Sequence, residues 1–276
     1  AAHLAPQART SRAATQYREW VNDFDRAQAN YYRLIAGVDA AVGMIREGLG
    51  REGLAGNTVI IFTSDNGYNS GAHGFGDKVL PYEEGSKSPL MIYDPRLPRQ
   101  HAGKVSEAVT GGVDMAATIF ALAGVPAPAD IDGRNLLPLL ANPQGRVRDY
   151  LPLFNFWGIS SAQSMAVVTP EWKYIYWYYG GEGMNPAEEL FHVGQDRFEM
   201  SNVASDPRRG APLAELRKFY DAQLEHLARH VVRGHGYEAY PVLFNRAAGW
   251  DRKAPLLKEA EARRSSAGKG KKNKIP

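Results

Sequence analysis

Two adjacent side chains, Asp65 and Asn66, offer the ligand types that hard divalent cations prefer. They lie in the segment Thr63-Ser64-Asp65-Asn66-Gly67, and a carboxylate oxygen beside an amide oxygen suits Ca²⁺ or Mg²⁺. Asp, Asn and Gly are also common turn residues, and on these five residues alone an ordinary turn is the better interpretation. The surrounding elements must therefore decide between a turn and a metal site.

The segment follows a run of residues that is typical of a buried β-strand. Residues 58–63, Thr-Val-Ile-Ile-Phe-Thr, are β-branched or aromatic without polar alternation, which favours a central strand covered on both faces. In open α/β sheets, ligand sites lie beyond the carboxyl ends of the strands. Asp65 and Asn66 therefore leave this strand where a binding site is expected.

The neighbouring elements predict a mostly parallel sheet with flanking helices. A helix is expected over residues 17–49, a second buried strand over 89–93 and a short helix over 114–122. Helix, strand, strand and helix in this order are typical of a layered α/β domain. The first helix should bury one apolar stripe, which consists of Tyr31, Leu34, Ile35, Val38, Val42, Ile45 and Leu49.

After Pro143 the pattern changes to that of a small α+β subdomain. Residues 164–168, 173–178 and 189–193 predict short strands of an antiparallel sheet, and a helix is expected over 212–232. We therefore divide the chain into an α/β domain (1–145), an α+β subdomain (146–250) and a basic, flexible tail (251–276).

The composition excludes several classes of site and partner. The chain contains no cysteine, which excludes disulfides, thiolate metal ligands and a cysteine nucleophile within it. No run of about eighteen apolar residues occurs, so no membrane span is expected. The formal net charge of +3 is concentrated in residues 251–276, where nine Lys or Arg oppose three Asp or Glu. Because the remainder is slightly acidic, a nucleic-acid partner is not expected.

Beyond Asp65, a series of short motifs resembles the second half of the type I sulfatases, in the alkaline-phosphatase-like superfamily. The motifs, in order, are His73-Gly74, Asp77-Lys78, Tyr82-Glu83-Glu84-Gly85, Ser88-Pro89-Leu90, Asp132-Gly133-Arg134-Asn135-Leu136-Leu137-Pro138, Glu171-Trp172-Lys173-Tyr174-Ile175 and Glu189-Leu190-Phe191. The resemblance covers about residues 15–235. It rests on the occurrence of all these motifs in this order and not on any single motif. It implies part of an alkaline-phosphatase-like fold and the hydrolysis of sulfate esters.

The resemblance also implies roles for four residues. Asp65 and Asn66 would supply two of the four side-chain ligands of a Ca²⁺ ion, and Lys78 would contact the sulfate of the substrate. Charge moves onto the bridging oxygen as the S–O bond breaks, and a dication with an ammonium group stabilises that charge only if both are held in place. His73 stays open between contact with the sulfate or leaving oxygen and a role in ordering the loop.

The resemblance places the nucleophile outside this chain. Type I sulfatases attack with a formylglycine made from Cys or Ser in a C/S-x-P-x-R motif that precedes the metal pair, as do two further metal-binding aspartates. One serine string fits, Ser205-Asp206-Pro207-Arg208-Arg209, but it follows the metal pair. We interpret Ser205 as a helix-start residue. We expect the chain to be a C-terminal portion of such an enzyme and to be inactive alone.

Two other functions stay open. A phosphonate or phosphodiester hydrolase of the same superfamily would share the metal site, although Asn66 favours a sulfatase because many phosphohydrolase relatives have His there. A non-catalytic half-domain would explain the missing nucleophile. It would not need Lys78 at the position of the lysine that contacts sulfate in the family.

The substrate implied by the resemblance is a sulfated glycan or sulfated small molecule. Secretion or a bacterial periplasm would suit such a substrate. Trp157 and the aromatic residues of 172–179 would line a sugar cleft or pack the small sheet, and packing is favoured.

Overall fold

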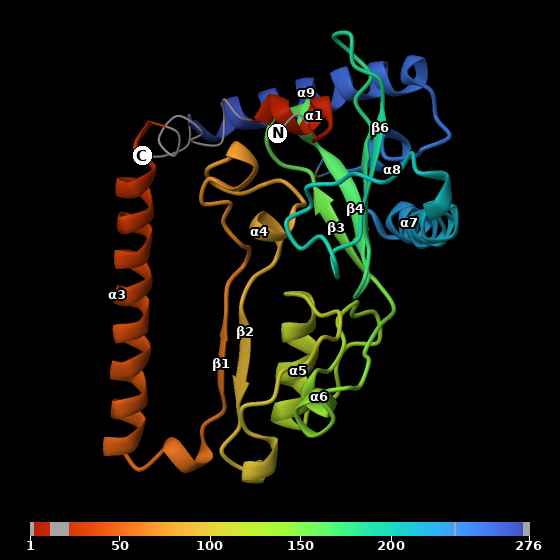
Figure 1. The fold of residues 1–276 in the computed structure, drawn as a ribbon. Helices are drawn as coiled ribbons and strands as arrows, with labels where there is room; N and C mark the ends of the chain where they lie inside the picture. The colour runs from red at the N-terminus through yellow and green to blue at the C-terminus, as the bar shows by residue number, and fades with distance from the viewer. Residues whose placement is uncertain (1–2, 12–21, 235, 273–276) are drawn as a thin grey trace. The chain divides into compact units, whose positions relative to one another are not determined.

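The computed structural model describes residues 3–11, 22–234 and 236–272, which belong to two compact units (Figure 1). The first unit comprises residues 15–78 and 82–151, and the second comprises residues 1–14, 79–81 and 152–276. We call them the α/β unit and the α+β unit.

The described residues of the α/β unit begin with one long helix and include two strands. Its elements are α3 (Phe24–Arg51), η2 (Ala55–Asn57), β1 (Ile60–Thr63), η3 (Ala72–Gly74), α4 (Glu83–Ser86), β2 (Leu90–Tyr93), η4 (Arg99–His101), α5 (Asp114–Ala123) and α6 (Leu137–Ala141). Asp23 caps α3, since its side chain accepts a hydrogen bond from the Arg26 backbone N–H. Gly124 ends α5 in the left-handed conformation (φ 66°), which a glycine adopts readily.

Strands β1 and β2 pair antiparallel, whereas the sequence predicted a mostly parallel sheet. Ile60 lies opposite Tyr93 and Thr63 lies opposite Leu90. Parallel neighbours need a long crossover, usually through a helix, but the connection between these strands holds only the short helices η3 and α4. Sheets that are otherwise parallel often carry an antiparallel strand, so this pair corrects the strand direction and leaves the α/β class intact.

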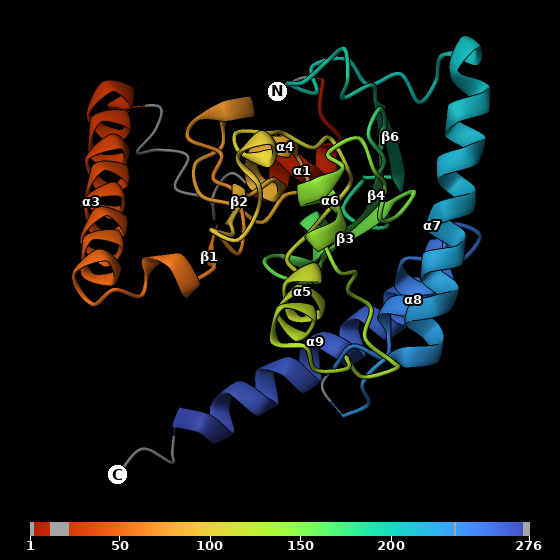
Figure 2. The ribbon, with the colours of Figure 1, turned by 90° about the horizontal axis from the view of Figure 1, so that it is seen from below.

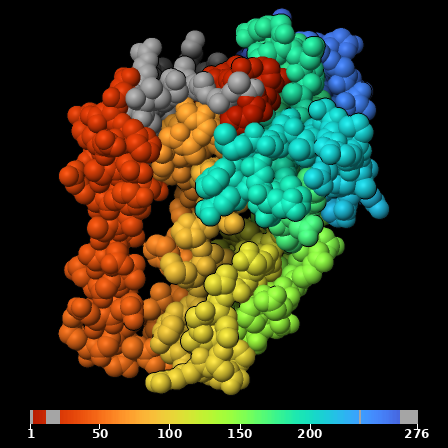
Figure 3. All heavy atoms as spheres, in the orientation of Figure 1, coloured from red at the N-terminus to blue at the C-terminus, as the bar shows by residue number. Residues whose placement is uncertain are grey.

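The apolar faces of α3 and of the β1–β2 pair are exposed within the described residues. Leu34 and Met44 of α3 each expose 71% of their surface, and Met91 and Tyr93 of β2 each expose 58%. Figure 3 shows open space beside much of α3. The spacing of apolar residues therefore predicted the helix correctly but not its burial, because the described residues supply no element that covers this face.

The α+β unit is built on a four-stranded sheet in the order β3-β4-β5-β6. Its elements are α1 (Pro6–Thr10), β3 (Leu151–Asn155), η5 (Ser160–Ala162), β4 (Ser164–Val168), β5 (Lys173–Trp177), β6 (Ala187–Phe191), η6 (Pro207–Arg209), α7 (Gly210–His230), α8 (Tyr240–Leu243) and α9 (Trp250–Lys272). β5 pairs antiparallel with both β4 and β6. The predicted short antiparallel sheet is confirmed.

Helix α7 covers this sheet, as predicted, and Figure 2 shows it beside the strands. Its inward face is formed by Leu213, Leu216, Tyr220 and Leu224. The Tyr220 ring meets the Tyr174 ring edge-on at 5.5 Å between centroids, and its hydroxyl donates to the Phe244 carbonyl oxygen at 2.7 Å. The buried hydroxyl is thus hydrogen-bonded while the ring fills the core.

The two ends of the described chain both pack in the α+β unit. The Ala5 backbone N–H donates to Glu189 Oε1 at 2.6 Å, so residues 3–11 lie here although the sequence assigned them to 1–145. Residues 250–272 form α9 instead of the predicted flexible tail. Lys253, Leu257 and Ala260 recur on one face of α9 and are buried, a short stripe that the surrounding charges obscure in the sequence. Among the described helices, none is both long and apolar enough to cross a membrane.

Candidate functional site

The loop between β1 and β2, residues 64–89, carries all four predicted site residues. Asp65 and Asn66 come directly after β1, and Asp65 is exposed. Asn66 Nδ2 donates to the Gly67 carbonyl oxygen at 2.8 Å, which leaves the amide oxygen as the ligand atom that this side chain offers. The pair therefore presents a carboxylate and an amide oxygen, a donor set that fits Ca²⁺.

Gly67 fixes the backbone directly after this pair. Its N–H donates to the Gly85 carbonyl oxygen at 3.1 Å. A Cβ at Gly67 would lie 2.1 Å from the Glu84 carbonyl oxygen and 2.7 Å from the Lys87 carbonyl oxygen. Since no side chain tolerates such contacts, only glycine lets the ligand pair rest against α4.

His73 packs inside the same loop. Its Nε2 lies 3.4 Å from Glu84 Oε2, and its side chain is almost completely buried. The ring centroid is 4.9 Å from that of Tyr82, and φ is 52°. These contacts favour the loop-ordering role of the two that the sequence left open.

Lys78 is exposed near the middle of the loop, on a constrained backbone. The residues on either side both have positive φ, 50° at Asp77 and 96° at Val79. A β-branched residue with positive φ is a genuine outlier, and such strain is found mainly where function requires it. The Asn69 N–H donates to the Asp77 carbonyl oxygen at 2.8 Å, so the chain turns back to Asn69 just before Lys78.

A buried carboxylate, Asp114, organises the segments on either side of α5. Its Oδ2 accepts from the Gly111 N–H at 2.8 Å, and its Oδ1 accepts from the Arg134 N–H at 2.7 Å. The Arg148 guanidinium pairs with the same carboxylate. The sequence predicted that Asp114 caps this helix, which is wrong, because Asp114 is the first residue of α5, Val113 is at the cap position and no side chain caps the helix. No signal in the sequence pointed to Arg148, which lies far along the chain.

Ser205 is exposed and lies before η6. The first turn of η6 is capped by the next residue, Asp206, whose Oδ1 accepts from the Arg208 N–H at 3.0 Å. The serine therefore stands at a helix start, one residue before the capping side chain.

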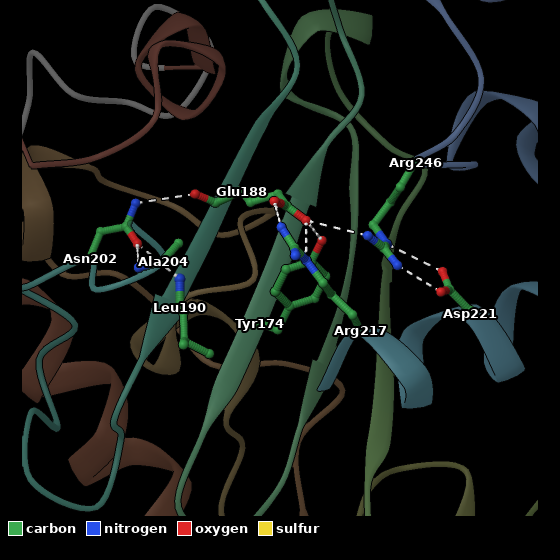
Figure 4. A network of polar contacts seen from close by, with 8 residues as sticks. All are labelled: Tyr174, Glu188, Leu190, Asn202, Ala204, Arg217, Asp221 and Arg246. Atoms are coloured by element: carbon green, nitrogen blue, oxygen red, sulfur yellow. Dashed lines mark hydrogen bonds and ion pairs between the residues drawn. The ribbon is translucent and has the colours of Figure 1, made fainter. Parts of the chain in front are cut away.

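A polar network of the α+β unit centres on Glu188 of β6 (Figure 4). Arg217 of α7 and the Tyr174 hydroxyl both donate to this carboxylate, and Arg246 lies 3.6 Å from it. Burial raises the pKa of Glu188, but the hydrogen bonds from Arg217 and Tyr174 outweigh it, so the pKa is lower than usual. Arg246 also pairs with Asp221 at 2.6 Å. The charges balance, so this network joins strand to helix.

Two family models match the chain. The model described as Sulfatase matches residues 3–125. The model described as N-sulphoglucosamine sulphohydrolase, C-terminal, matches residues 71–229, more than half of the chain. The two matches overlap over residues 71–125, which include most of the candidate loop, and the second continues through the four-stranded sheet to residue 229 in α7.

Curated relatives carry sulfatase names. The N-acetylglucosamine-6-O-sulfatase of Bacteroides thetaiotaomicron is 29% identical over 194 residues, which are 68% of this chain and 32% of the relative. Arylsulfatase K of Xenopus laevis is 32% identical over 185 residues, 64% of this chain and 33% of the relative. The chain thus spans about a third of the length of these relatives.

Solved structures share the fold. BT4656 in complex with its substrate D-glucosamine-2-N,6-O-disulfate gives a TM-score of 0.64 at 27% identity, over 71% of this chain and 40% of that one. The phosphonate monoester hydrolase of Agrobacterium radiobacter gives a TM-score of 0.61 at 27% identity, over 72% of this chain and 42% of that one. These matches confirm the predicted resemblance and the partial alkaline-phosphatase-like α/β fold, and the chain belongs to the sulfatase family.

Proposed function

We propose that this chain supplies one side of the metal site and the sulfate-binding lysine of a sulfate-ester hydrolase. The observation that carries the proposal is the Asp65–Asn66 pair, held directly beyond β1 on a backbone that only a glycine at position 67 permits. Lys78 lies in the same loop, between two residues with positive φ. Because the chain belongs to the sulfatase family, we assign metal binding to the Asp65–Asn66 pair and sulfate binding to Lys78.

Ca²⁺ is the ion that best fits this pair. When bound, it would supply positive charge against the negative charge that develops on the sulfate oxygens. Asp65 and Asn66 together offer one negative charge, whereas Ca²⁺ takes about six to eight oxygens, several of them from carboxylates. We therefore propose that further ligands, and the formylglycine nucleophile, come from sequence outside these 276 residues. The 276-residue chain alone should bind Ca²⁺ weakly and be inactive.

Lys78 would place its ammonium group against a sulfate oxygen. The side chain is exposed, and the constrained backbone on either side of it fixes the point at which it leaves the loop. His73 would act mainly by fixing the loop through Glu84 and Tyr82. A direct hydrogen bond from His73 to the sulfate or leaving oxygen remains the second possible role.

Phosphonate or phosphodiester hydrolysis is the second candidate activity. The observation that favours it is the likeness to the Agrobacterium radiobacter phosphonate monoester hydrolase, at a TM-score of 0.61. Both ester classes are anionic and would use the same cation and Lys78. Comparing kcat/KM for 4-nitrophenyl sulfate with that for a 4-nitrophenyl phosphonate monoester decides between them.

A sulfated glycan is the substrate class that we propose. One relative is named N-acetylglucosamine-6-O-sulfatase, and BT4656 was solved with D-glucosamine-2-N,6-O-disulfate as its substrate. A Drosophila melanogaster relative, 38% identical over 116 residues, is named an extracellular sulfatase SULF-1 homolog. We accordingly propose that the protein works outside the cytoplasm, secreted or in a periplasm.

The test uses the whole reading frame that contains these residues, expressed with formylglycine maturation. Lys78→Ala should lower kcat/KM for a sulfate ester by about a hundredfold, the scale of losing one charged transition-state contact. Lys87→Ala is the matched control, because Lys87 is exposed in the same loop and pairs with Glu83. Asp65→Asn should weaken Ca²⁺ binding in a calorimetric titration.

Two results would contradict the proposal. Equal losses for Lys78→Ala and Lys87→Ala would remove Lys78 from the substrate site. Turnover by the 276-residue chain alone, abolished by Ser205→Ala, would place the nucleophile at Ser205 and overturn the expected need for residues outside this chain.

A further inference from the structure

Two histidines lie one helical turn apart at the end of α7, and the proposed hydrolysis uses neither of them. His226 and His230 are four residues apart, the spacing that brings two side chains onto one face of a helix. His226 is half-buried and His230 is exposed. Their rings stack, with 4.2 Å between centroids and 29° between planes. Two imidazoles are therefore presented together at the surface of the α+β unit.

A hydrogen bond to the backbone orients the second ring. His230 Nδ1 lies 2.8 Å from the His226 carbonyl oxygen. Because a carbonyl oxygen only accepts, Nδ1 carries the proton and donates it to this bond. In a neutral imidazole the lone pair is then on Nε2, at the edge of the ring that faces away from the helix backbone. Histidines that bind metals donate their other ring N–H to a carboxylate, a backbone carbonyl or water in the same way.

The separation of the two rings suits the ligands of one metal ion. Zn²⁺ binds histidine nitrogen at about 2.0–2.1 Å, so two nitrogens in a tetrahedral shell lie about 3.4 Å apart. Rings whose centroids are 4.2 Å apart reach this spacing through small side-chain rotations. Two histidines four residues apart on one helical face also hold zinc in H-E-x-x-H segments. The helix therefore needs no rearrangement to present both ligands.

The end of the helix adds a favourable field for a cation. α7 is 21 residues long and ends at His230, where the unpaired carbonyl groups of the last turn carry partial negative charge. Arg229 is the other basic residue of this turn. Successive residues of a helix point about 100° apart, so Arg229 leaves α7 on a different face from the histidine pair.

Imidazole nitrogen selects the kind of ion. It suits Zn²⁺, Cu²⁺ and Ni²⁺, whereas Ca²⁺ and Mg²⁺ prefer carboxylate and carbonyl oxygens. Among the residues that the structure describes, neither histidine belongs to a cluster of three or more ligating side chains. Water would therefore fill the remaining positions around the ion. The chemistry differs from that of the Asp65–Asn66 pair, whose oxygen donors suit Ca²⁺.

We propose that His226 and His230 form a binding site for one transition-metal ion of the Zn²⁺ class. One ring nitrogen of each histidine would bind the ion, and Nε2 would be the ligand atom of His230. Both ligands come from a single helix, so the site is complete within the α+β unit. The inference does not depend on the proposed hydrolysis of sulfate esters.

Calorimetric titration of the whole protein with ZnCl₂, at pH 7.5 and in saturating Ca²⁺, tests the site. His226→Ala and His230→Ala should each weaken the binding step by about a hundredfold, because the second ligand of a chelate binds intramolecularly. His101→Ala is the matched control and should leave the step unchanged, since His101 is a histidine of η4 outside this helix. At pH 5.5 the step should weaken in the wild type, because a metal binds only the neutral imidazole.

His230→Arg separates metal binding from a purely structural role. Arginine keeps a positive charge at the end of the helix, which stabilises it as a charged histidine would, but it does not bind Zn²⁺. Added Zn²⁺ should raise the melting temperature of the wild type and not that of His230→Arg, because only a folded protein with both ligands binds the ion. Equal Zn²⁺ titration curves for the wild type and a His226→Ala/His230→Ala double variant would overturn the inference. So would a Zn²⁺-dependent rise in melting temperature that His230→Arg retains.

Discussion

Replacing Lys253 by methionine should stabilise the α+β unit at neutral pH. Lys253 of α9 is completely buried. Its Nζ donates to the Tyr176 hydroxyl at 2.8 Å and lies 4.9 Å from the centroid of that ring. Burial lowers the pKa of Lys253 from 10.5 to about 8. Lys253 is therefore protonated at pH 7 in both states. The folded state loses this proton near pH 8, whereas the unfolded chain loses it near pH 10.5.

The magnitude follows from this difference in pKa. A shift from 10.5 to about 8 corresponds to about 3 kcal/mol of destabilisation at pH 7. Below pH 8 both states are protonated and the full cost is present. Between pH 8 and 10.5 the folded state binds fewer protons, so stability rises with pH. Lys253→Met removes the cost but leaves Tyr176 without its partner, a loss of about 1 kcal/mol. The net gain at pH 7 is about 2 kcal/mol.

Urea unfolding at pH 7, 9 and 10.5, followed by tryptophan fluorescence, measures the effect. The advantage of Lys253→Met should shrink as the pH rises and should reverse near pH 10.5. Lys258→Met on the exposed face of the same helix is the control and should show neither effect. Equal or lower stability of Lys253→Met at pH 7, with an unchanged pH dependence, would refute the reasoning.

Three further substitutions test the packing around the candidate site and in the sheet. Gly67→Ala should cost about 2 kcal/mol in urea unfolding, since its Cβ meets backbone carbonyls of the α4 segment; Gly112→Ala, which meets nothing within 4 Å, should change little. Tyr174→Phe should lower the free energy of unfolding by about 1–2 kcal/mol, because the Glu188 carboxylate loses a hydrogen-bond donor. An unchanged urea midpoint would show that this hydrogen bond does not stabilise the fold. Arg148→Ala should cost about 3 kcal/mol, because it leaves Asp114 buried without its cation; thermal unfolding should detect this as a lowered midpoint, and Arg146→Ala at an exposed ion pair should not.

The elements of this protein were largely predictable from local pattern. The strand at 60–63, the helix at 114–123 and the antiparallel sheet after 150 all follow from periodicity and turn residues. The direction of β2 relative to β1 did not follow, because a strand's sequence does not record its partner. The helix at 250–272 was missed because three buried residues in a highly charged segment make a weak pattern.

The candidate site was predictable only in part. Asp65 and Asn66 stand out by ligand chemistry and by their position after a strand, and Lys78 stands out only through the family resemblance. The close approach of α4 to Gly67 gives no sequence signal. A glycine in a turn has the same sequence pattern whether or not a Cβ at that position would lie 2.1 Å from a backbone carbonyl oxygen. Likewise, Trp177 is completely buried whereas Trp157 exposes 76% of its surface, a difference that aromatic content does not report.

The hydrogen bond between Ala5 and Glu189 has a consequence for how the protein is made. It joins residues 184 positions apart, and the α/β unit lies between them in the sequence. At about 5–20 residues per second of synthesis, α1 waits on the order of 10–40 s before β6 exists. Residues 22–151 emerge whole during that interval. We therefore expect the inserted unit to become protease-resistant on the ribosome before residues 3–11 do, since their docking must await the synthesis of β6.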